Sequence, residues 1–272
     1  MIAVSAEWLF EHIDDSELII VDCRFSLNDS QLGKRQYQQS HIPNAHYLDL
    51  NQDLSSPVSE HGGRHPLPNL YDLSTKLSKI GVNRQTLVVA YDDSRLAYAA
   101  RLWWLLRYIG HERVAVLDGG FSGWLSFGYP LTDEVKQSDF KSQNLIFSPQ
   151  VQSQMVVDIT EVKNRKDLPG VVLVDSREEE RYLGIREPID KIAGHIKGAV
   201  NYPWQSVTNS SGYLLSIEDQ QQRWQEFADC KEIIVYCGSG VTACVNLLSL
   251  ELAGYKGKLY PGSWSDWISY ES

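Results

Sequence analysis

The chain has 272 residues, of which 43% are hydrophobic and 22% charged, and its formal net charge is -10. Such a length and composition are typical of one or two globular domains, each with its own core. The negative charge argues against nucleic acid or an anionic membrane surface as a partner.

Neither disulfides nor a structural metal site are expected. The four cysteines are scattered and form no CxxC pair; they are Cys23, Cys230, Cys237 and Cys244. The N-terminus, MIAVSAEWLFEHID, lacks the apolar stretch of a signal peptide or a membrane span. We therefore predict a cytoplasmic, reduced protein that binds no metal and no membrane.

Short apolar segments alternate with helical ones along the whole chain. The expected strands are 18–21, 87–91, 114–117, 171–174, 233–236 and 258–260. Residues 94–109 predict a helix that is apolar almost all round and hence well buried. This alternation indicates an α/β fold with a mainly parallel sheet, flanked by helices, in each half.

The two halves are related by an internal duplication. LIIVDCR at 18–24 matches VVLVDSR around Asp175 and Arg177, HIPNA at 41–45 matches HIKGA at 195–199, and GGFSGW matches GSWSDW. A period this long predicts duplicated domains and not a solenoid. We expect an N-terminal domain over 1–132, a polar linker over 133–153 and a C-terminal domain over 154–272.

The first half carries an insertion of about ten residues relative to the second, judged from the spacing of the matched landmarks. It falls within 51–69, NQDLSSPVSEHGGRHPLPN, which is rich in Pro, Gly and His and has no periodicity. Long loops in compact domains are often functional, so we expect an ordered, functional loop here.

Cys237 is the predicted nucleophile. It ends the strand at 233–236, and a glycine-containing turn and a helix from Ala243 to a stop at Gly254 follow it, with Thr242 as a possible cap. Backbone N–H groups at a helix N-terminus favour an anion, and thus the thiolate over the thiol. A small buried hydrophobe is the alternative role for such a cysteine.

The loop after Cys237 also separates this chain from cysteine phosphatases. Those enzymes need a guanidinium to hold the phosphate, and no Lys or Arg occurs between Cys237 and Lys256. In the first half the position opposite Cys237 is Asp92 or Asp93, depending on a one-residue gap. We interpret these aspartates as caps of the following helix, so only the second half should be catalytic.

The duplicated HI-x-x-A elements, the GGFSGW and GSWSDW endings and the single CGSGVT loop resemble the two-domain rhodaneses, that is, the thiosulfate and 3-mercaptopyruvate sulfurtransferases. The resemblance covers nearly the whole chain. It implies that Cys237 takes a sulfane sulfur from a donor, holds it as a persulfide and passes it to cyanide or a thiol, with ping-pong kinetics. It implies no cofactor and no metal.

The resemblance also assigns substrate-binding residues. The loop residues Gly238, Gly240, Val241 and Thr242 would surround the persulfide. The loop lacks the basic residues of thiosulfate-preferring members and resembles the mercaptopyruvate type, in which Ser239 would bind the substrate carbonyl or relay a proton. A turn residue bonded to its own backbone is the alternative for Ser239.

Two arginines and a histidine complete the predicted site. Arg181 matches the family's active-site arginine, Arg186 is a second candidate, and Ile189 stands where relatives place another arginine. His65 matches a histidine of the relatives' proton relay, but Asn51 stands at the position of the relay aspartate. Asp49 or Asp53 could substitute for it, whereas His41 and His195 are interpreted as structural.

These observations predict a sulfurtransferase that prefers 3-mercaptopyruvate and uses a thiol or cyanide as acceptor, with a thioredoxin-like reductant as a possible protein partner. Thiosulfate:cyanide sulfurtransfer is the alternative reaction. A persulfide carrier that delivers sulfur to a partner protein, without fast turnover on small donors, is the alternative of a different class.

Overall fold

The computed structural model describes residues 1–136 and 147–271. Its internal contacts divide the chain into two compact units. Unit 1 comprises Met1–Ser56, Pro68–Gln152 and Ser210–Leu214, and unit 2 comprises Pro57–Leu67, Ser153–Asn209 and Leu215–Ser272. The long loop predicted at 51–69 thus contributes residues 57–67 to unit 2 and the rest to unit 1. Of the predicted linker, residues 137–146 lie outside the described residues.

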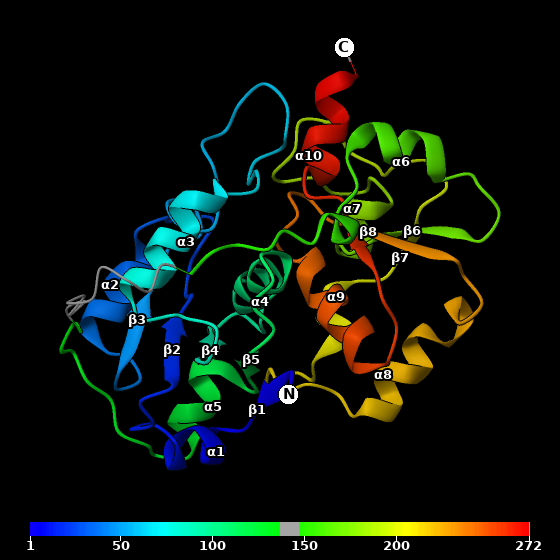
Figure 1. Ribbon diagram of the computed structural model, residues 1–272. Coiled ribbons are helices and arrows are strands. Elements are labelled where there is room, and N and C mark those ends of the chain that lie inside the picture. Colours follow the sequence, from blue (N-terminus) through cyan, green and yellow to red (C-terminus); the bar gives the residue numbers. More distant parts are fainter. Residues whose placement is uncertain (137–146, 272) are drawn as a thin grey trace. The chain divides into compact units, whose positions relative to one another are not determined.

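Unit 1 contains a parallel five-stranded sheet in the order β1-β5-β4-β2-β3 (Figure 1). Its strands are β1 Ala3–Val4, β2 Leu18–Asp22, β3 Ala45–Tyr47, β4 Leu87–Tyr91 and β5 Val114–Leu117. Its helices are α1 Ala6–Glu11, α2 Leu32–Gln39, α3 Leu70–Lys79, α4 Ala99–Tyr108 and α5 Gly120–Ser126. The sequence pattern missed β1 and β3, because two or three residues are too few to display a period.

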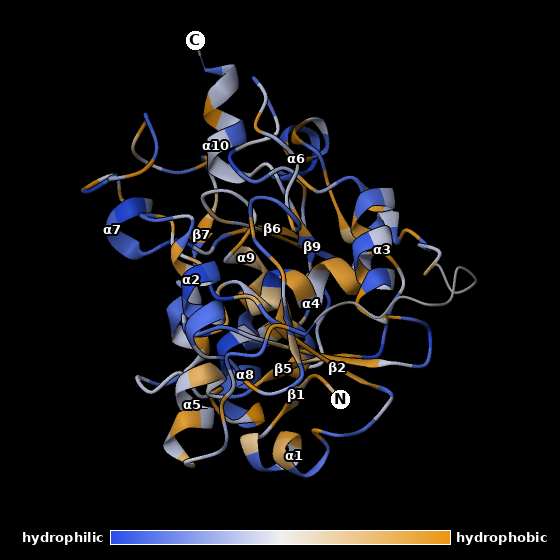
Figure 2. Cartoon of the chain, turned by 90° about the vertical axis from the view of Figure 1, so that its left-hand side faces the viewer, coloured by the Kyte–Doolittle hydropathy of each residue, from blue (hydrophilic) through white to orange (hydrophobic). Residues whose placement is uncertain are grey.

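The sheet of unit 1 is covered on both faces. Side chains that alternate along the strands, such as Ile20 and Val89, pack with residues of α1 and α5 in one core cluster. The opposite face packs against α4, whose residues are nearly all buried. Figure 2 shows hydrophobic colouring on β2, β5 and much of α4. Strands buried on both faces explain the continuous apolar segments of the sequence.

Unit 2 repeats this plan with a parallel four-stranded sheet in the order β7-β6-β8-β9. Its strands are β6 Val171–Asp175, β7 Val200–Asn201, β8 Glu232–Tyr236 and β9 Lys258–Leu259. Its helices are α6 Ile159–Arg165, α7 Glu179–Tyr182, α8 Ile217–Trp224, α9 Ala243–Leu252 and α10 Ser263–Trp267, with 3-10 turns at Ser153–Met155, Trp204–Val207, Gln225–Phe227 and Ile268–Tyr270. The predicted α/β class, with two parallel-sheet domains flanked by helices, is confirmed.

A buried ion pair marks the same place in both units. Asp22 is the last residue of β2 and lies 2.6 Å from Arg24, and Asp175 is the last residue of β6 and lies 2.6 Å from Arg177. In each unit a tyrosine at the end of the neighbouring strand approaches the aspartate; Tyr91 donates its hydroxyl to Asp22 at 2.8 Å. The matched VD-x-R elements of the sequence are therefore equivalent structural positions.

Helix α4 begins later than predicted. It starts at Ala99, five residues after the expected Ser94, and an irregular loop precedes it. The reason is Asp92, whose buried carboxylate accepts hydrogen bonds from the backbone N–H groups of Ser94, Leu96, Tyr98 and Ala99 at 2.8–3.1 Å. These bonds hold the loop in a non-helical path and also cap the helix.

Among the described residues, no helix is both long and apolar enough to cross a bilayer.

Candidate functional site

Cys237 lies at the carboxyl end of β8 in unit 2, directly before the turn that leads into α9. Its side chain is buried, with 1% of the residue exposed. β8 lies between β6 and β9, and both neighbours are parallel to it. Its carboxyl end therefore lies beside the carboxyl ends of these strands. This is the place where open α/β sheets bind ligands.

The loop after Cys237 presents unpaired backbone donors. In the part of the chain that the structure describes, the N–H groups of Ser239, Val241 and Thr242 donate to no protein acceptor. Thr242 precedes α9 but makes no side-chain cap bond, contrary to the expectation that it caps the helix. The free N–H groups are available to an anion at the thiol.

The backbone of this loop is held from the Pro261–Ser265 segment. Ser263 Oγ accepts the N–H of Cys237 at 3.1 Å, and the carbonyls of Cys237 and Gly238 accept N–H groups from Trp264 and Ser265 at 3.0 Å each. Gly240 has a φ of +73°, and a Cβ there would lie 2.3 Å from the carbonyl oxygen of Pro261. Only glycine fits this position without displacing the loop.

His65 and Ser239 meet in unit 2, as the resemblance implied. Nδ1 of His65 and Oγ of Ser239 are 2.8 Å apart, and both residues are 6% exposed. The two suggested substitutes for the relay aspartate have other partners: Asp53 forms an ion pair with Lys76, and Asp49 accepts the N–H groups of Asn51 and Gln52. The structure thus brings together an imidazole and a hydroxyl one residue beyond Gly238.

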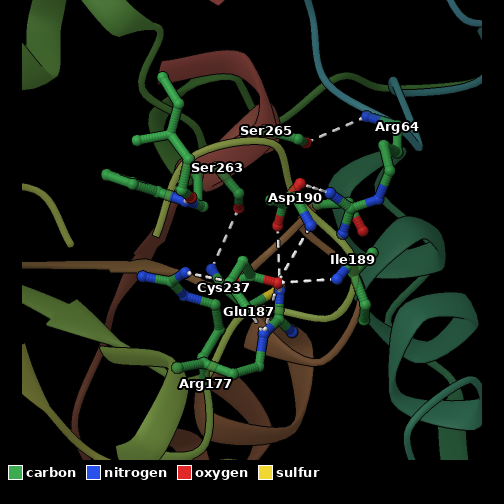
Figure 3. A network of polar contacts seen from close by, with 12 residues as sticks. Arg64, Arg177, Glu187, Ile189, Asp190, Cys237, Ser263 and Ser265 are labelled. Carbon is green, nitrogen blue, oxygen red and sulfur yellow. Dashed lines mark hydrogen bonds and ion pairs between the residues drawn. The ribbon is translucent and has the colours of Figure 1, made fainter. Parts of the chain in front are cut away.

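Arg181 belongs to a network of buried charges. Its Nη2 lies 2.8 Å from Glu187 and 2.9 Å from Asp190, and both carboxylates are almost fully buried. Glu187 also contacts Arg177 at 3.3 Å. Figure 3 shows this network beside Cys237. The carboxylates fix the direction of the guanidinium groups and keep them from folding back into solvent.

Arg64 reaches the same place from the Pro57–Leu67 segment. It pairs with Asp190, and its backbone N–H donates to Ser265 Oγ at 3.1 Å (Figure 3). A Cβ built on Gly238 would lie 2.9 Å from Arg64 Nη2 and 3.5 Å from Arg181 Nη2. Burial lowers the pKa of Arg64, and the positive charge of Arg181 lowers it further.

Arg186 has a different environment. Its side chain is 66% exposed, and its ion pair is with Glu180 at 3.9 Å. The structure gives it no contact with Cys237 or with the loop that follows. His41 and His195, interpreted as structural, each bind a backbone carbonyl through Nδ1, at 2.6 and 2.7 Å, and stack on a tyrosine.

Sequence reasoning did not place Ser263, Glu187 or Asp190 in the site, and it names Arg64 only as a source of positive charge if thiosulfate is the better donor. A signal existed for Ser263, which lies in the repeated GSWSDW ending, and for Arg64, which directly precedes His65. Glu187 and Asp190 lie in the segment between α7 and β7, on either side of Ile189.

Fold and site define a two-domain α/β protein in which the buried thiol of Cys237 lies at the turn between a strand and a helix. The model of the rhodanese-like domain matches residues 5–127 and again 158–270. The chain therefore belongs to the rhodanese-like domain family and carries two such domains in tandem.

Several proteins of similar sequence or structure carry the names of sulfurtransferases. A probable 3-mercaptopyruvate sulfurtransferase of Pseudomonas aeruginosa is 40% identical, with 98% of this chain and 94% of the relative covered. Thiosulfate sulfurtransferase of Rattus norvegicus is 31% identical, with 97% and 91% covered. The solved structure of a 3-mercaptopyruvate sulfurtransferase of Escherichia coli superimposes with a TM-score of 0.83 at 32% identity, covering 96% and 98%.

These likenesses confirm the predicted enzyme class. The protein is a sulfurtransferase of the rhodanese type, and it acts between a sulfur donor and a sulfur acceptor.

Proposed function

We propose that the protein transfers a sulfane sulfur from 3-mercaptopyruvate to a thiol or to cyanide through a persulfide on Cys237. The Cys237 thiolate attacks the donor sulfur, and the carbon–sulfur bond electrons leave with the pyruvate enolate, which takes up a proton. The acceptor then attacks the outer sulfur of the persulfide and regenerates the thiolate. The free N–H groups of the loop stabilise the persulfide anion.

The observation that carries this donor preference is the buried bond between His65 and Ser239 at 2.8 Å. An enolate leaving group must be protonated, and a hydroxyl bonded to an imidazole can relay a proton to it. The loop itself offers no charge, because it contains no Lys or Arg. Arg181 would bind the donor carboxylate, whereas an exposed Arg186 has no contact that supports such a role.

Thiosulfate is the second candidate donor. Its two negative charges suit the guanidinium groups of Arg64 and Arg181, both of which lie near Gly238. The sulfite that leaves needs no proton, so the relay would be idle with this donor.

The test is to measure kcat/KM of the purified protein with 3-mercaptopyruvate and with thiosulfate, using cyanide or a small thiol as acceptor. We expect a higher value with 3-mercaptopyruvate. Mass spectrometry after donor addition should find one added sulfur on the peptide with Cys237, and none in the Cys237→Ser variant. Better use of thiosulfate would overturn the donor preference, and sulfur on Cys23, Cys230 or Cys244 would overturn the mechanism.

A protein acceptor such as a thioredoxin-like reductant remains a prediction, as does a cytoplasmic location. The four cysteines are free thiols in the structure, which fits a reducing compartment. If small donors load Cys237 but small acceptors do not unload it, the persulfide-carrier alternative is favoured.

A further inference from the structure

The loop that carries the thiol lacks a cation of its own, yet the donors of this reaction class are anions. No Lys or Arg occurs between Cys237 and Lys256. The cations near the loop come from two other segments of unit 2: Arg181 from α7 and Arg64 from the Pro57–Leu67 segment. The two arginines have different surroundings, and this difference decides their roles.

Arg181 is held mainly by protein carboxylates. Its Nε lies 3.1 Å from both oxygens of Glu187, and its Nη2 contacts Glu187 and Asp190 at 2.8 and 2.9 Å. The Nε and Nη2 groups of Arg181 are therefore both occupied by protein carboxylates. An incoming anion has only the remaining N–H groups of this guanidinium to bind.

Arg64 has fewer protein partners. In the described part of the chain its guanidinium has one ion pair, through Nη1 to Asp190, which Arg181 shares. The other amino group, Nη2, lies over Gly238, where a Cβ would be only 2.9 Å away. Because Gly238 has no side chain, this amino group reaches the backbone next to the thiol.

We propose that Arg64 is a specificity-determining residue of the donor half-reaction and binds the anionic group of the sulfur donor through Nη2. This inference rests on the proposed function and adds a ligand from a segment outside the catalytic loop. The Arg64 side chain is partly buried, with 28% exposed, and it shares its one carboxylate with a second cation, so it gains from an added anion. A carboxylate at this place would lie between Arg64 and Arg181, over the residue that follows Cys237.

Removal of Arg64 should leave the site folded. Asp190 keeps its bond to Arg181 at 2.9 Å, so the variant does not leave a buried carboxylate without a partner. The Arg64 backbone bond to Ser265 is also independent of the side chain. Arg64→Ala is thus a fair test of the guanidinium itself.

The experiment compares Arg64→Ala and Arg64→Lys with the wild type and with Arg35→Ala, which removes an exposed arginine paired with Asp29 in unit 1. The loss of one charge-assisted hydrogen bond should raise the donor KM of Arg64→Ala roughly ten- to a hundred-fold. Arg64→Lys keeps the positive charge but lacks the planar guanidinium, so its donor KM should lie between those of the wild type and Arg64→Ala. The rate at which a neutral thiol unloads the persulfide should not change.

Two binding measurements separate this proposal from the proposed function. The inhibition constant of pyruvate, the product without the sulfur, should rise in parallel with the donor KM. In a Cys237→Ser background, which transfers no sulfur, calorimetry should find weaker thiosulfate binding when Arg64 is also replaced by Ala. Unchanged pyruvate inhibition and unchanged thiosulfate binding would overturn the role of Arg64, even if sulfur transfer itself is confirmed. Equal losses of rate in the donor and acceptor half-reactions would likewise contradict donor binding, because they would show that Arg64 only supports the structure of the loop.

Discussion

At the scale of single residues, the proposed donor half-reaction uses a thiol that is almost fully buried and a hydroxyl two residues away. Cys237 and Ser239 belong to the same turn, whereas His65 comes from a segment far away in the sequence. Burial excludes water from the thiol and strengthens each hydrogen bond made there. The loop can therefore be tested by changes that remove one group at a time.

Replacement of Ser239 or His65 by Ala should lower kcat with 3-mercaptopyruvate by roughly a hundred-fold or more, because proton transfer in the transition state is lost. With thiosulfate the loss should be much smaller, since sulfite leaves without protonation. Steady-state kinetics with both donors measures the difference. Equal losses with both donors would contradict a relay.

The Pro57–Leu67 segment, which carries His65, also offers a matched control for the relay. His61 forms a bond of the same kind, from Nδ1 to Ser269 Oγ at 2.8 Å, and stacks on Tyr270. His61→Ala removes a histidine–serine pair that lies outside the catalytic turn. It should keep the wild-type ratio of the two donor rates.

Gly240→Ala should abolish most of the activity. A methyl group at this position would meet the Pro261 carbonyl at 2.3 Å, and the φ of +73° disfavours any side chain. The loop would have to move away from Ser263 and the sulfur. Gly254→Ala is the control, because its φ is +85° but nothing lies within 4 Å of the added carbon. Similar activities of the two variants, measured at equal folded protein, would show that the close approach to Pro261 is unimportant.

At the scale of elements, the two units use one strand–loop–helix design for different ends. In unit 2 the turn between β8 and α9 leaves N–H groups free beside Cys237. In unit 1 the turn between β4 and α4 gives its N–H groups to the carboxylate of Asp92, which directly follows β4 as Cys237 follows β8. The carboxylate of Asp92 thus occupies in unit 1 the position that corresponds to an anion bound by the Cys237 loop in unit 2. This difference is the physical reason why we propose unit 2 alone as the catalytic one.

Asp92→Ala should destabilise unit 1 by about 2 kcal/mol or more, because four N–H groups, three of them buried, lose a charged acceptor. The amide protons of Ser94, Leu96, Tyr98 and Ala99 should exchange faster with solvent, which hydrogen exchange with mass spectrometry can measure. Asp93→Ala is the control, since the exposed Asp93 accepts only the N–H of Ser122 at 3.0 Å among the described contacts. Equal protection in the two variants would contradict the role assigned to Asp92.

At the scale of the whole molecule, two cores covered by helices carry the stability, and buried titratable groups make it depend on pH. His46 on β3 is 7% exposed, and burial, together with the charge of Lys136, lowers its pKa to about 4. An unfolded histidine has a pKa of about 6.5. Between these two values the unfolded chain binds more protons than the folded one, so stability falls as the pH decreases.

Acidification from pH 6.5 to pH 5 should therefore cost the wild type about 1.5 kcal/mol through His46 alone. The variant His46→Gln has no proton to bind at this position and should lack that part of the loss. Urea unfolding at both pH values measures the difference between the two proteins. Parallel losses of stability in the wild type and the variant would contradict this assignment.

The sequence by itself determined the class of the fold and the duplication, and it predicts the nucleophile. These depend on local patterns: apolar segments buried on both faces, matched VD-x-R and HI-x-x-A elements, and a cysteine between a strand and a glycine turn. The contact of His65 with Ser239 was also expected, but through the resemblance and not through any pattern in the residues themselves.

Only the tertiary structure decided how the charges are arranged. Three arginines, Arg64, Arg177 and Arg181, share two buried carboxylates, Glu187 and Asp190, and the partners of each pair lie in segments whose spacing has no period. The strength of such pairs depends on burial and on distances of a few ångströms, which the linear sequence does not encode locally. For the same reason the sequence ranked Arg186 beside Arg181, whereas the fold exposes Arg186 to solvent and directs Arg64 toward the thiol.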